Sequence, residues 1–424
     1  MSRAGPRLLV IMGSGETSPT MVKTHRSLFE RLGPDRVPAV LLDTPFGFQE
    51  NADQVAAKAV EYFRESVGRG IEVAGFRSAA MGDPVEREQT LARIAAARWV
   101  FSGPGSPSYA LRQWAGTPIP GLLTTKLRHG GCVVFASAAA LTLGVATVPV
   151  YEIYKVGEEP RWLEGLDLMA DAGLKVAVIP HFDNAEGGNH DTRYCYLGER
   201  RLRVMEAQLP DDAFVLGVDE HTGCLMDLDA GTVTVVGLGA VTIRRHGSSS
   251  TVPSGSSVPI ASLVETAMAG KGGAAPGPIA PRPITASGQT GDASPLLETI
   301  RQQEQGFDAA VAGRDVDGAV RAILELDDAL VAWSRDTLQS DHMDQGRAAL
   351  RRMIVKLGAL AEAGARDPRS VLGPFVAALL EERAAARAGG RFGDADRVRD
   401  RLVALGLEVR DTPNGTEWEL PGPA

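Results

Sequence analysis

Hydrophobic residues in the first part of the chain gather in short, nearly continuous runs. These runs lie at residues 8–12 (LLVIM), 37–42 (VPAVLL), 71–76 (IEVAGF), 99–102 (WVFS), 132–136 (CVVFA) and 175–179 (KVAVI). Amphipathic stretches with apolar residues at helical spacing separate most of them, as at residues 51–67 and 86–97. Apolar strands that alternate with helices are typical of a parallel sheet covered on both faces, so the pattern predicts an α/β fold with a parallel sheet flanked by helices.

The pattern changes after residue 214. Shorter runs with alternating polarity follow at residues 214–218, 224–228, 232–236 and 241–244, and turns such as Asp229-Ala230-Gly231 separate them. Alternation over a few residues favours half-buried strands in an antiparallel arrangement. We therefore expect an α/β domain over residues 1–246 that ends in antiparallel strands.

The rest of the chain divides into two parts of different character. Residues 247–295 are rich in Gly, Pro, Ser and Ala, which predicts a flexible linker, with a short helix left open at 261–269. Residues 296–424 carry apolar stripes at helical spacing and end in a strong Asn414-Gly415 turn signal. They predict an α-helical domain that closes with a hairpin over residues 407–420.

Composition narrows the class of protein. The 424 residues are 44% hydrophobic and 23% charged, which excludes a mainly disordered chain. No apolar stretch approaches the ~18 residues of a membrane span, and residues 8–12 are too short for a signal-peptide core. Three cysteines (Cys132, Cys195 and Cys224) are too few for a disulfide framework. We expect a cytoplasmic protein with no membrane partner, and the abundance of Ala, Gly and Arg is typical of a high-GC bacterial genome.

Charge argues against one broad function. The net charge of −9 and the sequence pI of about 5.4 do not favour a protein whose main activity is non-specific nucleic-acid binding.

Two glycine-rich turns each leave two interpretations open. Gly13-Ser14-Gly15 follows the first predicted strand, either as a tight strand-to-helix turn or, less favoured, as a nucleotide-binding loop without its third glycine. The turn at residues 103–109 (GPGSPSY) follows the run WVFS. It is either a plain turn or an anion site that uses the Gly103 or Gly105 amide, because Pro104 has no amide hydrogen.

Ser137 lies where the run 132–136 meets a helix start made of small residues. A serine at such a turn presents its hydroxyl above the sheet, as in a nucleophile elbow, with the Ala138 amide placed as an oxyanion donor. A serine that merely caps the helix is an equal alternative on local evidence.

His181 and Glu220 also follow predicted strands. His181 comes after residues 175–179, at the strand end where ligands bind in α/β folds, and a structural histidine is the alternative. Glu220 is able to orient such a histidine, although a solvated turn is locally favoured. The spacing of His181 with Asp183, and of His190 with Asp191, is unspecific, so we expect no metal and no cofactor.

Taken in order, these segments resemble the peptidase E (aspartyl dipeptidase) and cyanophycinase family of serine peptidases, over about residues 7–245. The resemblance rests on the glycine turn at 101–105, the ASAAA sequence at 136–140, the block Pro180-His181-Phe182-Asp183-Asn184, the Arg-rich segment 192–205 and the sequence VLGVDE at 215–220. It implies a fold like the class I glutamine amidotransferase domain and a Ser-His-Glu triad.

The resemblance also implies residue roles. Ser137 would be the nucleophile, His181 the general base and Glu220 the residue that orients it. The oxyanion and the substrate would be bound by Gly103, Gly105, Ala138, Asp183, Asn184 and Arg193. The chain departs from the family's Gly-x-Ser-Ala-Gly elbow, because Phe135 and Ala139 replace the two glycines and Pro104 interrupts the double glycine.

A different family is resembled at the C-terminus. The segments 382–387, 391–400, 405–407 and 411–418 look like the C-terminal end of cysteinyl-tRNA synthetase, and residues 307–380 are compatible with its helical anticodon-side domain. The chain has no HIGH or KMSKS signature and no zinc-ligating cysteine set, so we do not expect it to activate cysteine. Residues 296–424 carry 17 basic and 22 acidic side chains, which does not favour strong phosphate binding.

Three hypotheses follow. The leading one is a serine hydrolase that cleaves a peptide or amide bond in a small substrate. The second is a binding protein of the same fold that has lost turnover. The third is a tRNA-associated protein that acts through the synthetase-like segment. The alternative for that segment, slightly favoured over RNA binding, is a helical module for protein contact or homo-oligomer formation.

Overall fold

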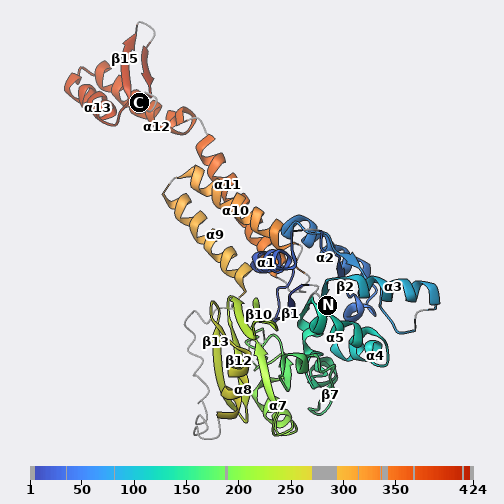
Figure 1. The fold of residues 1–424 in the computed structure, drawn as a ribbon. Helices are drawn as coiled ribbons and strands as arrows, with labels where there is room; N and C mark the ends of the chain where they lie inside the picture. The colour runs from blue at the N-terminus through green and yellow to red at the C-terminus, as the bar shows by residue number, and fades with distance from the viewer. Residues whose placement is uncertain are drawn as a thin grey trace. The chain divides into compact units, whose positions relative to one another are not determined.

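The computed structural model describes residues 5–34, 36–80, 82–186, 190–269, 294–313, 315–334, 336, 342–365, 368–412 and 415–420 (Figure 1). The chain divides into two compact units. The first comprises Met1–Gln302 with Leu324–Arg347, and the second comprises Gln303–Ile323 with Ala348–Ala424.

The larger sheet of the first unit has eight strands in the order β14-β11-β10-β1-β5-β4-β2-β3. Its parallel part consists of β1 (Arg7–Met12), β5 (Gly131–Ala136), β4 (Trp99–Ser102), β2 (Ala39–Leu41) and β3 (Glu72–Val73). On the other side of β1 the antiparallel strands are β10 (Thr222–Asp227), β11 (Thr232–Gly237) and β14 (Ser257–Pro259).

A second sheet has six strands in the order β13-β12-β9-β8-β6-β7. The strands β6 (Ala146–Thr147), β8 (Val176–Ile179) and β9 (Phe214–Val218) are parallel, whereas β7 (Leu163–Glu164), β12 (Ala240–Arg245) and β13 (Ser248–Pro253) run antiparallel to their neighbours. The expected α/β fold with flanking helices is confirmed. It contains two mixed sheets, because β9 pairs with β8 while the next strand, β10, pairs with β1.

Alternate residues of β1 point into two separate cores. Leu8 and Val10 pack beneath α1 (Val22–Leu32) and α2 (Ala52–Tyr62). Leu9 and Ile11 pack on the opposite face with residues of α3 (Pro84–Ala96), α4 (Pro107–Trp114), α5 (Ile119–His129) and α8 (Ile260–Ala269). The remaining helical segments of this part are α6 (Ser137–Leu141), α7 (Gly198–Glu206), η1 (Pro19–Met21), η2 (Thr44–Phe46), η3 (Phe63–Val67), η4 (Glu152–Val156) and η5 (Leu168–Ala172).

The α/β domain extends beyond the boundary expected at residue 246. Strands β13 and β14 and helix α8 occupy residues 248–269, which were expected to begin the linker. The Ser- and Thr-rich strand β13 is held by backbone pairing along β12, and α8 buries Ile260, Leu263 and Ala267. Composition does not report backbone pairing, which is why the sequence suggested a linker here. Residues 270–293 of that segment lie outside the described residues.

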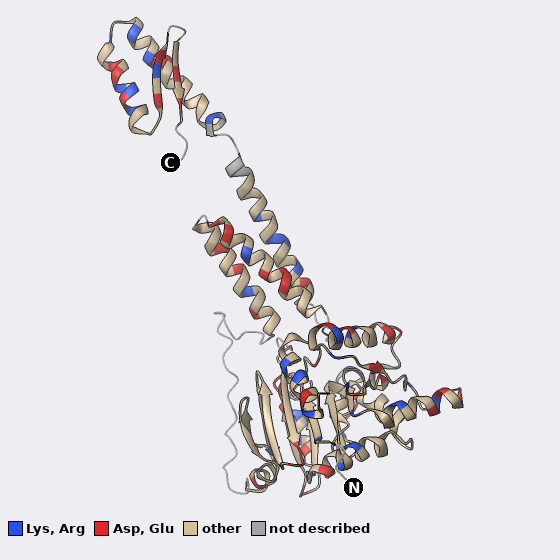
Figure 2. Ribbon diagram, turned by 45° about the horizontal axis from the view of Figure 1, so that its top comes forward, with Lys and Arg blue, Asp and Glu red and all other residues tan. Residues whose placement is uncertain are grey.

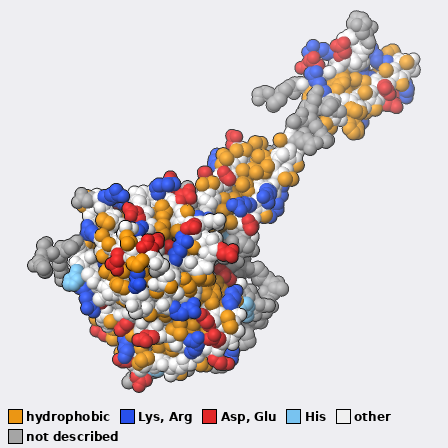
Figure 3. Space-filling view, turned by 90° about the vertical axis from the view of Figure 1, so that its right-hand side faces the viewer, with side chains coloured by type: hydrophobic (Ala, Val, Ile, Leu, Met, Phe, Trp, Pro, Cys, Tyr) orange, Lys and Arg blue, Asp and Glu red, His pale blue; other side chains and the backbone are white. Residues whose placement is uncertain are grey.

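The C-terminal part is helical, as predicted. It contains α9 (Pro295–Ala312), α10 (Val316–Trp333), α11 (His342–Ala365), α12 (Pro368–Ala388) and α13 (Phe392–Ala404), followed by a hairpin of β15 (Glu408–Thr412) and β16 (Gly415–Glu419). Both signs of charge are interspersed along these helices (Figure 2), and hydrophobic side chains are visible at their surface (Figure 3). Leu324 and Phe375 are among the exposed apolar residues. None of the described helices has the length and hydropathy needed to cross a membrane.

A small core holds α12, α13 and the hairpin together. It is built from Val376, Leu402, Leu407 and Val409. Arg383 is buried beside this core, and its guanidinium donates two hydrogen bonds to the Asp411 carboxylate, at 2.6 and 2.8 Å. The ion pair fixes α12 against the hairpin.

A buried ionic cluster joins the second sheet to α7. Arg244 on β12 is 3% exposed, and its guanidinium donates to the carboxylates of Glu206 and Glu199, at 2.8 to 3.0 Å. The same guanidinium lies 5.2 Å from the centre of the Tyr194 ring. The ion pairs of Arg244 connect the sheet to α7, and its contact with the Tyr194 ring connects the sheet to the segment that precedes α7.

We expect Arg244→Met to lower the free energy of unfolding by about 3 kcal/mol, because it leaves the Glu206 carboxylate buried without a cation. The matched control is Arg203→Met, which removes an exposed partner of Glu199 and should cost less than about 1 kcal/mol. Equilibrium denaturation of both variants measures the difference, and equal losses would contradict the structural role of Arg244.

Candidate active site

Ser137 lies at the sharp turn between β5 and α6. Ala136 is extended, with φ −128° and ψ 155°, and Ser137 then has a positive φ of 48°. A left-handed backbone costs a residue with a Cβ roughly 1–2 kcal/mol, so the surrounding structure must impose it. The turn lies at the carboxyl end of a parallel strand, where α/β folds bind ligands.

The two departures from the family's elbow are accommodated by packing. Phe135 pairs with Ile11 and Ser102 within the sheet, and its fully buried ring packs 5.7 Å from that of Trp114. Its bulk therefore lies in the core rather than in the turn. Ala139 is also fully buried, and its amide donates to the Gly103 carbonyl at 3.1 Å, which ties the nucleophile's helix to the glycine turn.

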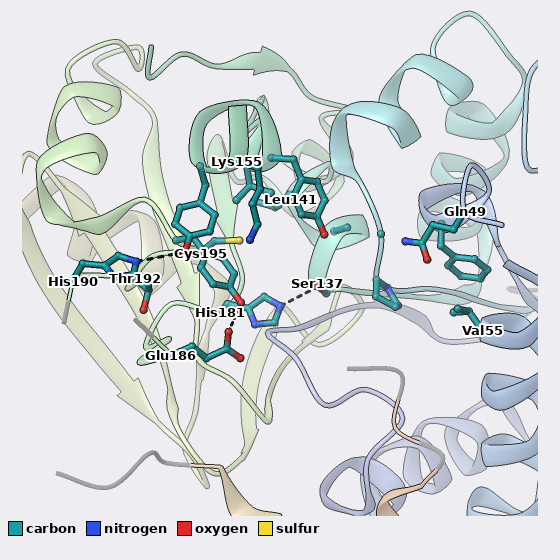
Figure 4. A pocket seen from close by; sticks show the side chains of 18 residues that line it. Gln49, Val55, Ser137, Leu141, Lys155, His181, Glu186, His190, Thr192 and Cys195 are labelled. Carbon is teal, nitrogen blue, oxygen red and sulfur yellow. Dashed lines mark hydrogen bonds between the residues drawn. The ribbon is translucent and has the colours of Figure 1, made fainter. Parts of the chain in front are cut away.

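His181 follows β8 and stands between Ser137 and Glu220. Its Nε2 lies 2.9 Å from Ser137 Oγ, and its Nδ1 lies 2.7 Å from Glu220 Oε1 (Figure 4 shows the first contact). Because a carboxylate only accepts hydrogen bonds, Nδ1 carries the proton and Nε2 is free to accept from the serine hydroxyl. His181 has a positive φ of 48°, and its carbonyl accepts the Cys195 amide at 3.1 Å.

Asp183 and Asn184 hold Glu220 in place. The Glu220 amide donates to Asp183 Oδ1 at 2.7 Å, and Asn184 Nδ2 donates to Glu220 Oε1 at 3.1 Å. Asn184 is fully buried. Neither residue lines the pocket around Ser137, so the structure places both behind Glu220, whereas the resemblance suggested contact with the substrate or the oxyanion.

The charges of this chain favour an ionised Glu220 and a basic His181. Burial opposes ionisation of Glu220, but the hydrogen bond and charge of His181 outweigh it and hold the pKa of Glu220 at about 2. Burial likewise disfavours the charged imidazolium. The hydrogen bond and the negative charge of Glu220, joined by Glu186 and by Glu16 in its ionised form, outweigh that effect and raise the pKa of His181 above its ordinary value.

Two residues with backbone amides available to a ligand line the pocket beside Ser137. Gly105 and Ala138 both line it, and no acceptor for either amide lies among the described residues. Gly105 has a φ of 134°, and a Cβ there would lie 2.1 Å from the Pro45 carbonyl oxygen, so only glycine fits. Gly103, also expected to bind the oxyanion, is buried beneath the turn and does not line the pocket.

The pocket around Ser137 has a volume of about 450 Å³. One wall comes from η4, with Tyr154 and Lys155, and from Tyr151 directly before it, and Lys155 points into the pocket (Figure 4). Glu186 lines the pocket close to His181 and accepts the Tyr196 hydroxyl at 2.6 Å. This wall could not be predicted, because the segment around η4 has neither a motif nor a helical apolar period.

Tyr194, Cys195 and Tyr196 form a left-handed turn, with φ of 62°, 54° and 65°. Three consecutive non-glycine residues in this region are strained, and the turn places Cys195 and Tyr196 in the pocket wall. Arg193, expected to bind substrate, lies outside the pocket. Its guanidinium forms a bidentate pair with the Asp191 carboxylate, at 2.8 Å for both bonds.

The first glycine turn packs against the protein itself. A Cβ on Gly13 would lie 2.0 Å from the Asp219 carbonyl oxygen, and one on Gly15 would lie 2.1 Å from His221 Nδ1. The glycines thus permit close packing on the β9–β10 connection, which favours the tight-turn interpretation. Within the described part of the chain, no three His, Cys, Asp or Glu side chains are grouped to hold a metal ion.

Comparison with solved structures returns peptidases for the α/β part. A peptidase from an acI-B1 actinobacterium aligns with a TM-score of 0.49 and 20% identity, over 61% of this chain and 98% of that one. A protein assigned as peptidase E from Listeria monocytogenes EGD-e aligns with a TM-score of 0.36 and 12% identity, over 58% of this chain and 98% of that one.

Comparison of sequences identifies the C-terminal segment. Residues 370–418 match the family model of the cysteinyl-tRNA ligase anticodon binding domain. The cysteine–tRNA ligase of Salinibacter ruber is 66% identical over 41 residues, which is 10% of this chain and 8% of the ligase. That of Halorhodospira halophila is 38% identical over 81 residues, 17% of this chain and 18% of the ligase. The resemblance of the C-terminus to this ligase family is confirmed for a segment that spans less than a fifth of either ligase.

Proposed function

We propose that this protein is a serine hydrolase that cleaves a peptide or amide bond through an acyl-enzyme. One observation carries the proposal. A continuous hydrogen-bond chain joins Ser137, His181 and Glu220 at one pocket, next to the unbonded amides of Gly105 and Ala138. A nucleophile, a base and an orienting carboxylate in this order are the elements of acyl-transfer catalysis.

The reaction would proceed in two halves. Ser137 Oγ attacks the substrate carbonyl carbon as its proton passes to His181 Nε2, and the negative oxygen that forms accepts hydrogen bonds from the Gly105 and Ala138 amides. The carbon–nitrogen bond then breaks, and His181 returns the proton to the leaving amine. In the second half a water molecule gives a proton to His181 as it attacks the ester carbon. The bond from that carbon to Ser137 Oγ then breaks, His181 returns the proton to Oγ, and the carboxylic acid product leaves.

Labelling by a fluorophosphonate probe tests the nucleophile. We expect the probe to modify the wild-type protein at Ser137, and Ser137→Ala to abolish labelling because no other hydroxyl is bonded to His181. Ser262→Ala, on α8, is the control and should label normally. Absence of labelling and of hydrolysis across acidic and basic dipeptides would favour the binding-protein hypothesis.

The pH dependence of labelling tests the base. His181 acts only when neutral, so the rate should rise as pH increases through the raised pKa of His181. Glu220→Gln removes the charge that raises this pKa and replaces the carboxylate acceptor of Nδ1 by a neutral, weaker amide oxygen. In this variant we expect the labelling rate to rise at a lower pH than in wild type. We expect its maximal rate to fall by about 10²-fold or more. An unchanged profile would argue against the role of Glu220.

A second candidate function is contact with tRNA through residues 370–418, and the match to an anticodon binding domain favours it. A gel shift on total tRNA should show binding that weakens as salt increases and is lost when the chain ends after residue 365. The shortened chain must keep the wild-type rate of probe labelling, which shows that the α/β domain remains folded. Equal shifts for both chains would contradict this candidate.

A further inference from the structure

Glu16 is a buried carboxyl group that the proposed mechanism does not use. It lies in the loop after β1, is 1% exposed, and its Oε2 has no hydrogen-bond partner among the described residues. Its Oε1 touches the oxyanion turn from beneath, because a Cβ on Gly103 would lie only 2.9 Å away. Gly103 in turn accepts the Ala139 amide from the helix that begins with Ser137.

The backbone of Glu16 is fixed. Its carbonyl oxygen accepts a hydrogen bond from His25 Nε2 at 2.8 Å. His25 is fully buried in edge contact with four aromatic rings, those of Tyr62, Phe63, Trp99 and Phe101. The backbone from which the buried carboxyl group extends is therefore anchored to this aromatic cluster.

We propose that the Glu16 carboxyl is a positioning group of the active site, which in its neutral form supports the Gly103–Gly105 turn and keeps negative charge away from the oxyanion. A buried carboxylate without a cation is unfavourable, whereas a protonated carboxyl can stay buried. Ionisation would put a negative charge beside the turn whose amides receive the oxyanion. That charge would oppose the one that develops in the transition state.

The groups that face Glu16 agree with this assignment. Burial is the largest influence and raises the pKa of Glu16 to about 7. This value of the pKa already includes a hydrogen bond from the Glu16 backbone amide, which lowers it, the nearby charge of Asp336, which raises it, and attraction to His181, which lowers it. Of the other titratable neighbours, burial lowers the pKa of His25 to about 4 and raises that of Tyr62, so both are neutral near pH 7.

The raised pKa of Glu16 makes the stability of the folded protein depend on pH. Because the pKa of Glu16 is higher in the folded than in the unfolded chain, the folded state binds the proton more tightly, and stability falls as pH rises from about 4.5 to about 7. Glu16→Gln cannot ionise and should escape this loss. Relative to wild type, the Tm of this variant should increase by about 3 °C or more between about pH 5 and about pH 9.

The kinetic test rests on the proposed function and compares probe labelling of Ser137 in four proteins. Glu16→Gln should match wild type within about twofold near pH 6 and label about fivefold faster or more near pH 9. Glu16→Ala removes the side chain that supports the turn, and its labelling rate should be lower than that of wild type by about tenfold or more at every pH. Glu30→Gln, on the exposed face of α1, should match wild type throughout.

The outcomes separate this inference from the proposed function. If wild type labels but Glu16→Gln keeps its pH profile, or Glu16→Ala labels normally, the role of Glu16 is refuted and the hydrolase proposal stands. If no protein labels, the hydrolase proposal fails, and the positioning role fails with it. The stability comparison then still decides whether the buried carboxyl is neutral. An unchanged Tm difference between about pH 5 and about pH 9 would refute that part as well.

Discussion

Backbone strain around one pocket is the constraint on which the candidate site depends. Ser137, His181 and the residues of the turn 194–196 all have positive φ although none is glycine. Each costs free energy that regular structure does not, so packing elsewhere must compensate. The compensation is visible: the Cys195 amide bonds to the His181 carbonyl, and Arg244 packs on the Tyr194 ring while it neutralises Glu206. The buried ion pairs of the second sheet thus support the geometry of the histidine.

Two of the strained residues, Ser137 and His181, could be predicted from the sequence segments that precede them. A parallel strand ends where the chain must turn, and apolar runs mark those ends, so Ser137, His181 and Glu220 could be named before any coordinates. Their order along the chain added the family resemblance. The structure brings the three together, with Ser137 Oγ 2.9 Å from His181 Nε2 and His181 Nδ1 2.7 Å from Glu220 Oε1.

Other features could not be predicted, for identifiable reasons. Strand β13 is held by backbone hydrogen bonds, and its composition, rich in serine, gives no indication of this pairing. The wall formed by η4 has no periodic apolar pattern, so Lys155 gave no signal. Glu16 directly follows the first glycine turn, and no motif of the sequence singles it out. Its burial beneath Gly103 depends on residues far apart in sequence that meet in three dimensions.

The roles of Asp183, Asn184 and Arg193 separate two tasks that the sequence merged. Asp183 and Asn184 form hydrogen bonds with Glu220, and Arg193 forms an ion pair with Asp191. Side chains occupied in this way are poor candidates for selecting a substrate. Lys155 has no anionic partner among the described residues, yet it points into the pocket from η4. The ring of Tyr154 in η4 packs 4.9 Å from that of Tyr196 in the strained turn, and Ile153 shares a core with Tyr194 and Cys195. Substitution of Lys155, whose Nζ lies 4.9 Å from the centre of the Tyr154 ring, can therefore change the pocket while the contacts that hold the strained turn remain.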